Sequence, residues 1–190
     1  MALTKTQQSS LAGAAKAAVN VEGTSRVPAA LTMAQWAIES GWGKFAPGNN
    51  CFGIKASSTS PGRQLLTTKE WFTEAELRAF LAVGGGRTAA PVSPAQSRGA
   101  RRLYTVKDWF AAYETLDACF AEHARLLSSG SFYRAAFQQY LKDHKVEAYA
   151  RAIAVHYSTT PSYADAVLSI MRNADVVAAL QSSKAKPAPA

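Results

Sequence analysis

Residues 35–55 read QWAIESGWGKFAPGNNCFGIK and place one acidic residue, Glu39, among several aromatic residues. Upstream of them, Pro28 opens an apolar-rich pattern that predicts a mostly buried helix over residues 28–40, ended by Gly41. Glu39 therefore lies in the last turn of this helix. At that end, the negative pole of the helix dipole disfavours an ionised carboxylate.

The aromatic residues near Glu39 are expected to add to this effect. Trp36 precedes it by three residues, and Trp42 and Phe52 follow within the same stretch, so they would remove water from the carboxylate and raise its pKa. A glutamic acid that stays protonated near neutral pH can give a proton to a leaving oxygen, as the general acid of a glycosidase does. From position alone, a solvated glutamate at a helix end is the alternative.

Two parts of this stretch, AIESGWGK and PGNNCFGIK, resemble the signature of glycoside hydrolase family 73. These are bacterial peptidoglycan glucosaminidases related to the flagellar rod-cap hydrolase domain. Three later segments, FAEHARLL, FYRAA and YSTTPSYADAVLSI, are similar to further blocks of that family, so the resemblance spans roughly residues 27–172. It implies a mainly α (α+β) fold, namely a lysozyme-like helical domain with a small antiparallel β-lobe across a cleft, and it implies Glu39 as catalytic acid.

The implied reaction is hydrolysis of the β-1,4 bond between N-acetylglucosamine and N-acetylmuramic acid in peptidoglycan. A lytic transglycosylase is the nearest alternative, because it shares the fold and a single catalytic glutamate. A non-catalytic basic module that binds the wall or nucleic acid is the alternative from another class.

A second carboxylate is needed unless the 2-acetamido group of the substrate itself attacks the anomeric carbon. In TTKEWF, Glu70 resembles the glutamate of the family's β-lobe, where we expect it to stay ionised. Glu74, Glu76 and Asp108 are nearby competitors, and a solvated strand residue beside a lysine is the structural alternative for Glu70.

The resemblance also suggests residues that bind the substrate. Tyr157 and Tyr163 flank TTP as the family's cleft tyrosines do, and tyrosine suits a sugar because its ring stacks while its hydroxyl forms hydrogen bonds. Packing in the core is the alternative for both. Along the same cleft we expect Trp42, Asn50, Phe52 and Lys55.

Metal chemistry and cofactors are not expected. His123, His144 and His156 are scattered and form no metal-binding motif with an acidic residue or a cysteine. Cys51 and Cys119 are the only cysteines, and their sequence separation permits a disulfide without favouring one; we expect two buried free thiols, because these are the commoner outcome.

Composition and charge bound the remaining possibilities. With 190 residues and 48% hydrophobic residues, the sequence predicts a single domain over residues 1–182, followed by a flexible tail or linker over residues 183–190 (SKAKPAPA). The net charge of +8 favours an anionic partner, for which we expect acidic cell-wall polymers. Nucleic acid is not expected, because no binding signature or basic aromatic face is evident. We expect a monomer.

The sequence contains no segment that resembles a signal peptide and no run of 18 apolar residues, so we expect no membrane span. The implied activity would nevertheless place the protein at the cell wall, in the periplasm or outside the cell. A removed leader, a phage lysis system or another secretion route would then carry it there.

The remaining pattern predicts helices around one small sheet. Residues 64–72 alternate in the manner of a strand, with Leu66, Thr68, Glu70 and Phe72 on one face, and residues 103–113 are expected to pair with them antiparallel. Between the strands, Thr73 and Glu76 fit a capping box for a short helix, and residues 84–99 predict a mobile loop. Helices are expected over residues 5–20, 116–127, 132–140, 146–157 and 161–180, with Gly23 ending the first and Ser131 and Thr160 as caps.

Overall fold

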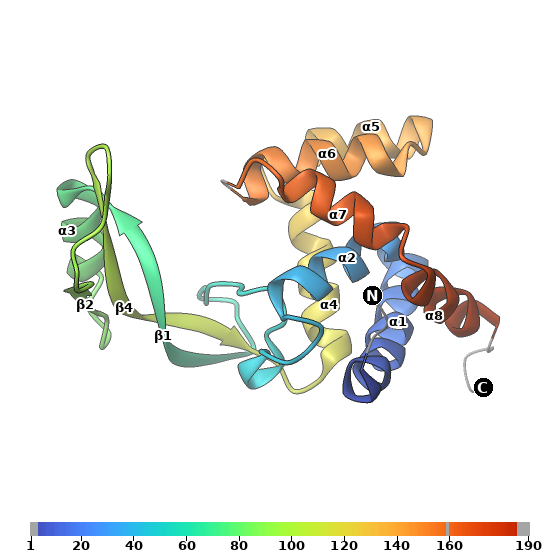
Figure 1. Ribbon diagram of the computed structural model, residues 1–190, viewed down its shortest axis with the longest axis horizontal. Helices are drawn as coiled ribbons and strands as arrows, with labels where there is room; N and C mark the ends of the chain where they lie inside the picture. The colour runs from blue at the N-terminus through green and yellow to red at the C-terminus, as the bar shows by residue number, and fades with distance from the viewer. Residues whose placement is uncertain (1–3, 159, 186–190) are drawn as a thin grey trace. The chain divides into compact units, whose positions relative to one another are not determined.

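The computed structural model in Figure 1 describes residues 4–158 and 160–185. The chain folds as two compact units. Unit 1 comprises the described parts of residues 1–52 and 113–190, and unit 2 comprises residues 53–112. Unit 2 is therefore inserted into the chain of unit 1.

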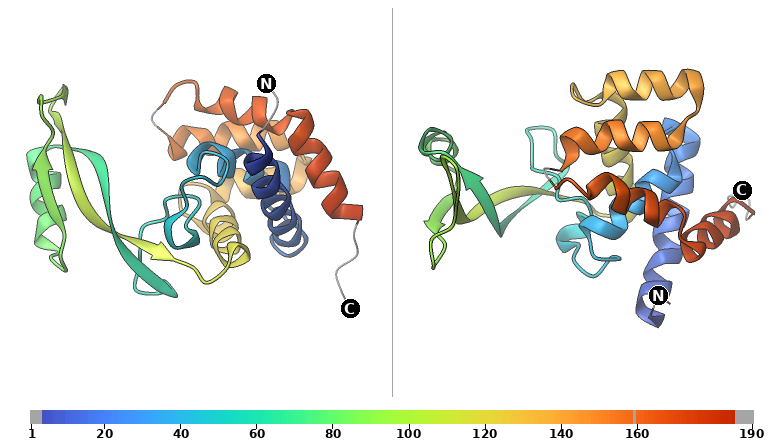
Figure 2. Two further views of the ribbon diagram at one scale, coloured as in Figure 1. Left: turned by 60° about the horizontal axis from the view of Figure 1, so that its bottom comes forward. Right: turned by 45° about the horizontal axis from the view of Figure 1, so that its top comes forward.

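Unit 1 is helical. Its helices are α1 (Lys5–Ser25), α2 (Ala29–Glu39), the 3-10 helix η1 (Pro47–Asn49), α4 (Leu116–Ser129), α5 (Arg134–Asp143), α6 (Val146–Tyr157), α7 (Tyr163–Met171) and α8 (Ala174–Ala185). Helix α1 packs against α2, α4 and α8, and α2 packs against α7. Figure 2 shows α1 beside α8 and α5 beside α6.

Helix α2 is the buried centre of unit 1. Leu31 and Met33 have no exposed surface and Trp36 is 1% exposed, although these three residues point in different directions around the helix. Burial on all sides is possible because α1, α4, α7 and α8 each contact α2. The predicted helix over residues 28–40 is thus confirmed, with Pro28 as the residue before the first helical position and Glu39 as the last.

Unit 2 is a four-stranded antiparallel sheet with one helix. It contains β1 (Gly62–Phe72), α3 (Glu74–Ala82), β2 (Thr88–Pro91), β3 (Ser97–Arg98) and β4 (Arg101–Ala112). Strand β4 pairs with β1, β2 and β3. The expected antiparallel pairing is confirmed, with Gln64 opposite Phe110 and Phe72 opposite Arg102. Along β1 the even-numbered residues are less exposed than the odd-numbered ones up to Glu70, as the alternation predicts.

The segment over residues 84–99 differs from the predicted loop, because it contains β2 and β3. Strand β1 satisfies only one edge of β4, and the other edge pairs with Thr88–Pro91, which places Thr88 opposite Lys107. The backbone N–H and C=O groups on this second edge of β4 thereby gain hydrogen-bond partners. The capping box before α3 is confirmed, since Thr73 Oγ1 accepts a hydrogen bond from the Glu76 N–H and Glu76 accepts one from the Thr73 N–H.

The predicted end of α1 and the predicted start of α5 are wrong. Helix α1 continues through Gly23 and ends at Ser25, because the following residue, Arg26, takes a left-handed conformation with φ +64°. Helix α5 begins at Arg134 instead of following a Ser131 cap. The amide groups of Tyr133 and Arg134 both donate to the Gly130 carbonyl, so the intervening residues form a turn.

The helix predicted over residues 161–180 is two helices. Asn173 separates them, because its side-chain oxygen accepts hydrogen bonds from the amides of Asp175 and Val176 and so caps α8. Thr160 does not cap α7, because the residue before the first helical position is Ser162. The Thr160 carbonyl instead accepts a hydrogen bond from the amide of Tyr163, the first residue of α7.

The end of the chain also differs from expectation. Residues 183–185 of the predicted tail belong to α8, and residues 186–190 lie outside the described residues. Among the described helices, none has the length and apolar character required to cross a membrane.

A pair of glycine substitutions tests the packing of unit 1. Gly43 has φ +82°, and an added Cβ would lie 3.0 Å from Trp36 Cζ2 and 3.2 Å from Ser10 Cβ. Gly43→Ala should therefore lower the free energy of unfolding by about 1–3 kcal/mol. The control is Gly13→Ala in α1, where the Cβ meets nothing within 4 Å, and it should raise that free energy by about 0.5–1 kcal/mol. Equal changes in thermal unfolding temperature for the two variants would contradict this packing.

Candidate active site

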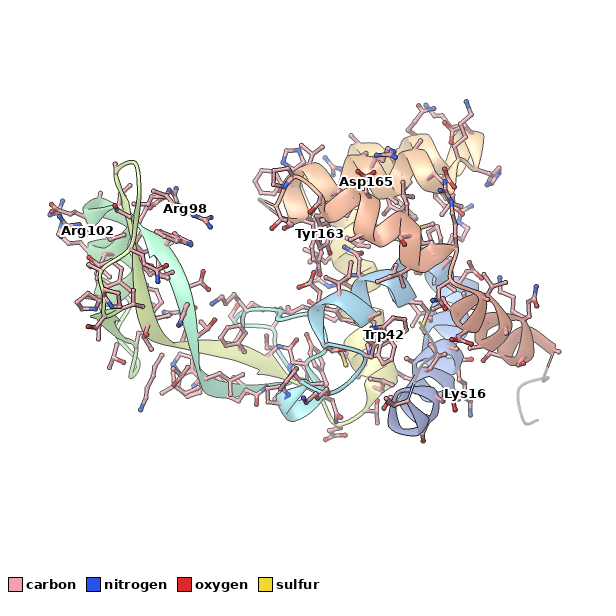
Figure 3. The ribbon with its side chains drawn as sticks, viewed as in Figure 1. Lys16, Trp42, Arg98, Arg102, Tyr163 and Asp165 are labelled. Carbon is pink, nitrogen blue, oxygen red and sulfur yellow. The ribbon has the colours of Figure 1, made fainter. Side chains whose placement is uncertain are left out.

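Glu39 and Tyr163 form the centre of the candidate site in unit 1. Tyr163, the first residue of α7 (Figure 3), donates a hydrogen bond from its hydroxyl to Glu39 Oε1 over 2.7 Å. The same hydroxyl accepts a hydrogen bond from Gln35 Nε2 over 3.2 Å. Gln35 and Glu39 are four residues apart on α2, so both side chains face α7. Because Gln35 is completely buried, it fixes the position of the Tyr163 oxygen.

The chain turns sharply after Glu39 and thereby ends α2. Gly41, Trp42 and Gly43 all have positive φ, a conformation that is unfavourable for the non-glycine Trp42. The ring of Trp42 lies edge-on against Trp36 with the centroids 6.1 Å apart. Ser40 further stabilises the turn, because its hydroxyl donates to the Trp36 carbonyl and accepts from the Gly43 amide. The carboxyl group of Glu39 is consequently left at the surface of the unit.

Two opposing effects act on the carboxyl group of Glu39. Partial burial raises its pKa, and the hydrogen bond from Tyr163 lowers it by a smaller amount, so the pKa lies above the ordinary glutamate value. Glu39 nevertheless keeps an exposed face. A carboxyl group that is reluctant to ionise and still reachable from solvent has the properties of a proton donor.

Two tyrosines interact with Glu39, Tyr163 through its hydrogen bond and Tyr157 through the charge of the carboxylate, in addition to the aromatic residues that the sequence suggested. Tyr157 at the end of α6 stacks on Tyr163, with the centroids 5.8 Å apart and the planes at 15°. Burial, followed by the nearby Glu39 charge, raises the pKa of both tyrosines. Both hydroxyls are therefore neutral at physiological pH and able to donate hydrogen bonds.

A row of stacked rings continues from Tyr157 into the core. His123 lies edge-on to Tyr157 at 6.0 Å, and Phe52 stacks on His123 at 3.8 Å. Burial lowers the pKa of His123 to about 3, and neither ring nitrogen has a hydrogen-bond partner within the described part of the chain. His123 is therefore neutral and serves as a packing residue.

The other predicted binding residues of unit 1 differ in accessibility. Asn50 and Phe52 are each 5% exposed, which indicates that they hold the loop after η1 in place. Trp42 and Tyr157 are half-buried, and Tyr163 is 7% exposed. Contact between these five residues and a substrate stays a prediction.

Unit 2 holds Glu70 in a small network of charges. Lys55 Nζ lies 3.0 Å from Glu70 Oε1 and 2.8 Å from Asp108 Oδ2, and Arg87 Nε lies 2.6 Å from Asp108 Oδ1. The Lys55 ammonium also lies over the Phe110 ring at 4.1 Å. Lys55 is thus a partner of two carboxylates, and its predicted contact with a substrate stays a prediction.

Asp108 and Glu70 differ in how strongly the network of charges holds them. Burial of Asp108 opposes ionisation, but the hydrogen bonds from Lys55 and Arg87 outweigh this effect and lower its pKa. Asp108 thus pairs with two cations, whereas the Glu70 side chain is 38% exposed and, within the described part of the chain, forms an ion pair with Lys55 alone. Of the competing carboxylates, Glu76 is part of the capping box and also pairs with Arg101.

Gln35 and the bridging position of Lys55 are functional features that the sequence alone did not reveal. Gln35 carried a signal, because it is a polar residue one turn before Glu39 in a helix that is mostly apolar. Among the described residues, no group of three or more His, Cys, Asp or Glu side chains could hold a metal ion.

A helical unit with a buried central helix, a small antiparallel sheet inserted in its chain and a glutamate at the end of the central helix define a lysozyme-like glycoside hydrolase. The sequence model of the glucosaminidase family, described as mannosyl-glycoprotein endo-beta-N-acetylglucosaminidase, matches residues 15–176. The chain therefore belongs to the glucosaminidase family, glycoside hydrolase family 73, as its signature indicated.

Solved structures share this fold. The catalytic domain of the autolysin Auto from Listeria monocytogenes superposes with a TM-score of 0.64 at 19% identity and covers 95% of this chain and 89% of its own. A peptidoglycan hydrolase from Sphingomonas sp. A1 gives 0.60 at 23% identity, covering 96% and 98%. The glycoside hydrolase domain of FlgJ from Salmonella typhimurium gives 0.60 at 22% identity, covering 94% of each chain. The comparison with curated proteins gave no match.

Replacing Tyr163 tests the balance of effects on Glu39. Tyr163→Phe removes the hydrogen bond that lowers the Glu39 pKa, so this pKa should rise further above its ordinary value. NMR titration of the labelled Glu39 carboxyl carbon measures the shift. Tyr157→Phe is the matched control, because it keeps the stacked ring and removes no hydrogen bond to Glu39. An unchanged Glu39 pKa in Tyr163→Phe would contradict the geometry described here.

Proposed function

We propose that this protein hydrolyses the β-1,4 bond between N-acetylglucosamine and N-acetylmuramic acid in peptidoglycan, with Glu39 as general acid. The observation that supports this role is the partly buried, yet accessible, carboxyl group whose Oε1 is held by Tyr163. Family membership supports a glucosaminidase reaction. The names of the structural neighbours, an autolysin and a peptidoglycan hydrolase, support peptidoglycan as the substrate.

In the proposed reaction, Glu39 gives its proton to the glycosidic oxygen as the bond to the leaving sugar breaks. Tyr163 occupies Oε1, so Oε2 is the oxygen that presents the proton. Gln35 donates a hydrogen bond to the Tyr163 hydroxyl oxygen, so the hydroxyl proton stays directed at Glu39. After proton transfer, the Tyr163 hydrogen bond stabilises the new carboxylate, because hydrogen bonds to charged groups are stronger than those to neutral ones.

Glu70 is the proposed second carboxylate. Its position on β1 and its exposed side chain make it available to activate a water molecule as general base. The alternative is that the substrate's 2-acetamido group attacks the anomeric carbon, with Glu70 orienting that group. The sequence resemblance and the exposed side chain support Glu70 over Asp108, whose carboxylate is occupied by two cations.

The substrate contacts are proposed for the half-buried aromatic residues. Tyr157 would stack on a sugar ring, and Trp42 would contribute a second aromatic surface. We further propose that the protein acts as a monomer at the cell wall, in the periplasm or outside the cell, and that the net charge of +8 favours acidic wall polymers as partners.

Glu39→Gln tests the general acid. It should lower the rate of release of soluble wall fragments by about 10²–10⁴-fold, because the amide cannot donate a proton that the leaving oxygen can take. The wild-type rate should fall as the pH rises through the raised pKa of Glu39. Glu147→Gln is the control, since this exposed glutamate on α6 pairs with Arg172. Full activity of Glu39→Gln would remove Glu39 from the mechanism.

The same variant should be more stable than the wild type at neutral pH. Because folding raises the pKa of Glu39, the folded protein holds this proton more tightly than the unfolded chain. Stability is therefore lost as the pH rises from the ordinary to the raised pKa, and Glu39→Gln avoids this loss. Thermal unfolding should show a higher Tm for the variant at pH 7 and no such gain below about pH 4.

The identity of the products distinguishes the mechanisms. We expect hydrolysis with inversion, so NMR of a defined glycan fragment should show the α-anomer first, and Glu70→Gln should lose most of the activity. An initial β-anomer together with a mild Glu70→Gln defect would instead indicate attack by the acetamido group. A product mass lower by one water would identify a lytic transglycosylase, and wall binding without turnover would identify a binding module.

A further inference from the structure

The two cysteines of the chain meet inside unit 1, although 67 residues separate them in sequence. The backbone N–H of Cys51 donates to Cys119 Sγ over 3.4 Å, and the two thiols are hydrogen-bonded to each other. Cys51 is 2% exposed and Cys119 is completely buried. Both are free thiols in this structure.

The two thiols differ in their surroundings. Cys51 lines a hollow of about 870 Å³, together with Trp36 of α2, Phe45 of the following loop, residues of α1 and Leu116 of α4. Cys119 lies on α4 and does not line this hollow. A small molecule that enters the hollow therefore reaches Cys51 before Cys119.

The two thiols also differ in the direction in which their pKa is shifted. The hydrogen bond with Cys119 lowers the pKa of Cys51, and an indole N–H from Trp36 adds to this effect against burial. The same hydrogen bond, together with burial, raises the pKa of Cys119. Cys51 is thus the thiol that is both nearer to the hollow and easier to deprotonate.

We propose that Cys51 and Cys119 are a site of reversible oxidation that forms an intramolecular disulfide by exchange with a small disulfide such as oxidised glutathione. In the first step, the Cys51 thiolate attacks one sulfur of that disulfide, forms a mixed disulfide and releases one thiolate. In the second step, the Cys119 thiolate attacks the Cys51 sulfur and releases the second thiolate. Two protein thiols are oxidised to one disulfide, two protons are released, and one small disulfide is reduced to two thiolates.

The position of this bond gives it a structural consequence. The chain leaves unit 1 after Phe52, directly beyond Cys51, and returns to it at Tyr113, shortly before α4. The disulfide would enclose all of unit 2 in one covalent loop and constrain the unfolded chain. That the protein works in a compartment that favours disulfides rests on its proposed action at the cell wall.

Native full-length protein, fully reduced and then incubated with oxidised glutathione, provides the test. We expect intact mass spectrometry to show a loss of two hydrogens with no attached glutathione, and peptide mapping to show Cys51 joined to Cys119. The oxidised form should unfold at a Tm higher by roughly 5–15 °C than the reduced form, and reductant should reverse the change.

Single variants separate the order of attack from simple accessibility. Cys119→Ser should accumulate a glutathione adduct on Cys51, whereas Cys51→Ser should react much more slowly, because Cys119 is buried behind it. Wild-type protein that keeps both thiols, or that carries glutathione without closing the bond, would overturn the proposal. Reduced wild type is measured in parallel, so the conclusion stands even if a serine variant fails to fold. Mass and Tm are independent of turnover, so inactivity on peptidoglycan would refute only the proposed function.

Discussion

The hydrogen bond from Tyr163 to Glu39 depends on the burial of α2, and the role proposed for Glu39 depends on this bond. Helix α2 is enclosed by α1, α4, α7 and α8, which fixes the axis along which Gln35 and Glu39 face α7. Gln35 donates to the Tyr163 oxygen, so the tyrosine proton is left for Glu39. A fully solvated glutamate without an ordered donor beside it would lack both the partial burial that raises the pKa of Glu39 and the hydrogen bond to its carboxyl group.

The secondary structure was predictable where one local rule acted alone. The apolar sequence of residues 29–38 identified α2, and alternation in β1 gave its face and partner strand correctly. Errors arose where two rules competed. Asn173 could continue a helix or cap one, and the structure uses it as a cap, which splits the predicted last helix. Strand β2 was missed because its short sequence TAAP carries a weak strand signal, and it is the unpaired edge of β4 that selects it.

The place of Glu39 at the end of α2 was predictable from the sequence, and its surroundings were less so. The position of Glu39 follows from local sequence alone, because Gly41 ends the helix. Its partners Tyr157 and Tyr163 come from α6 and α7, more than a hundred residues away, and only family resemblance suggested them. The aromatic neighbours expected from local spacing are used elsewhere: Trp36 supports the turn through Trp42, and Phe52 packs on His123. Spacing along the sequence cannot show whether an aromatic ring packs against Glu39 or against other rings, because it does not define which residues from other helices contact that ring.

The charges of unit 2 bear on whether Glu70 is free to act. Lys55 is shared between Asp108, whose side chain is 9% exposed, and Glu70, whose side chain is 38% exposed. The link to Asp108 is the better protected of the two, and Arg87 reinforces it. The link to Glu70 is an exposed pair, which contributes about 0–1 kcal/mol. Glu70 can therefore exchange its contact with Lys55 for a water molecule at little cost, whereas the departure of Asp108 would remove the carboxylate with which Arg87 pairs.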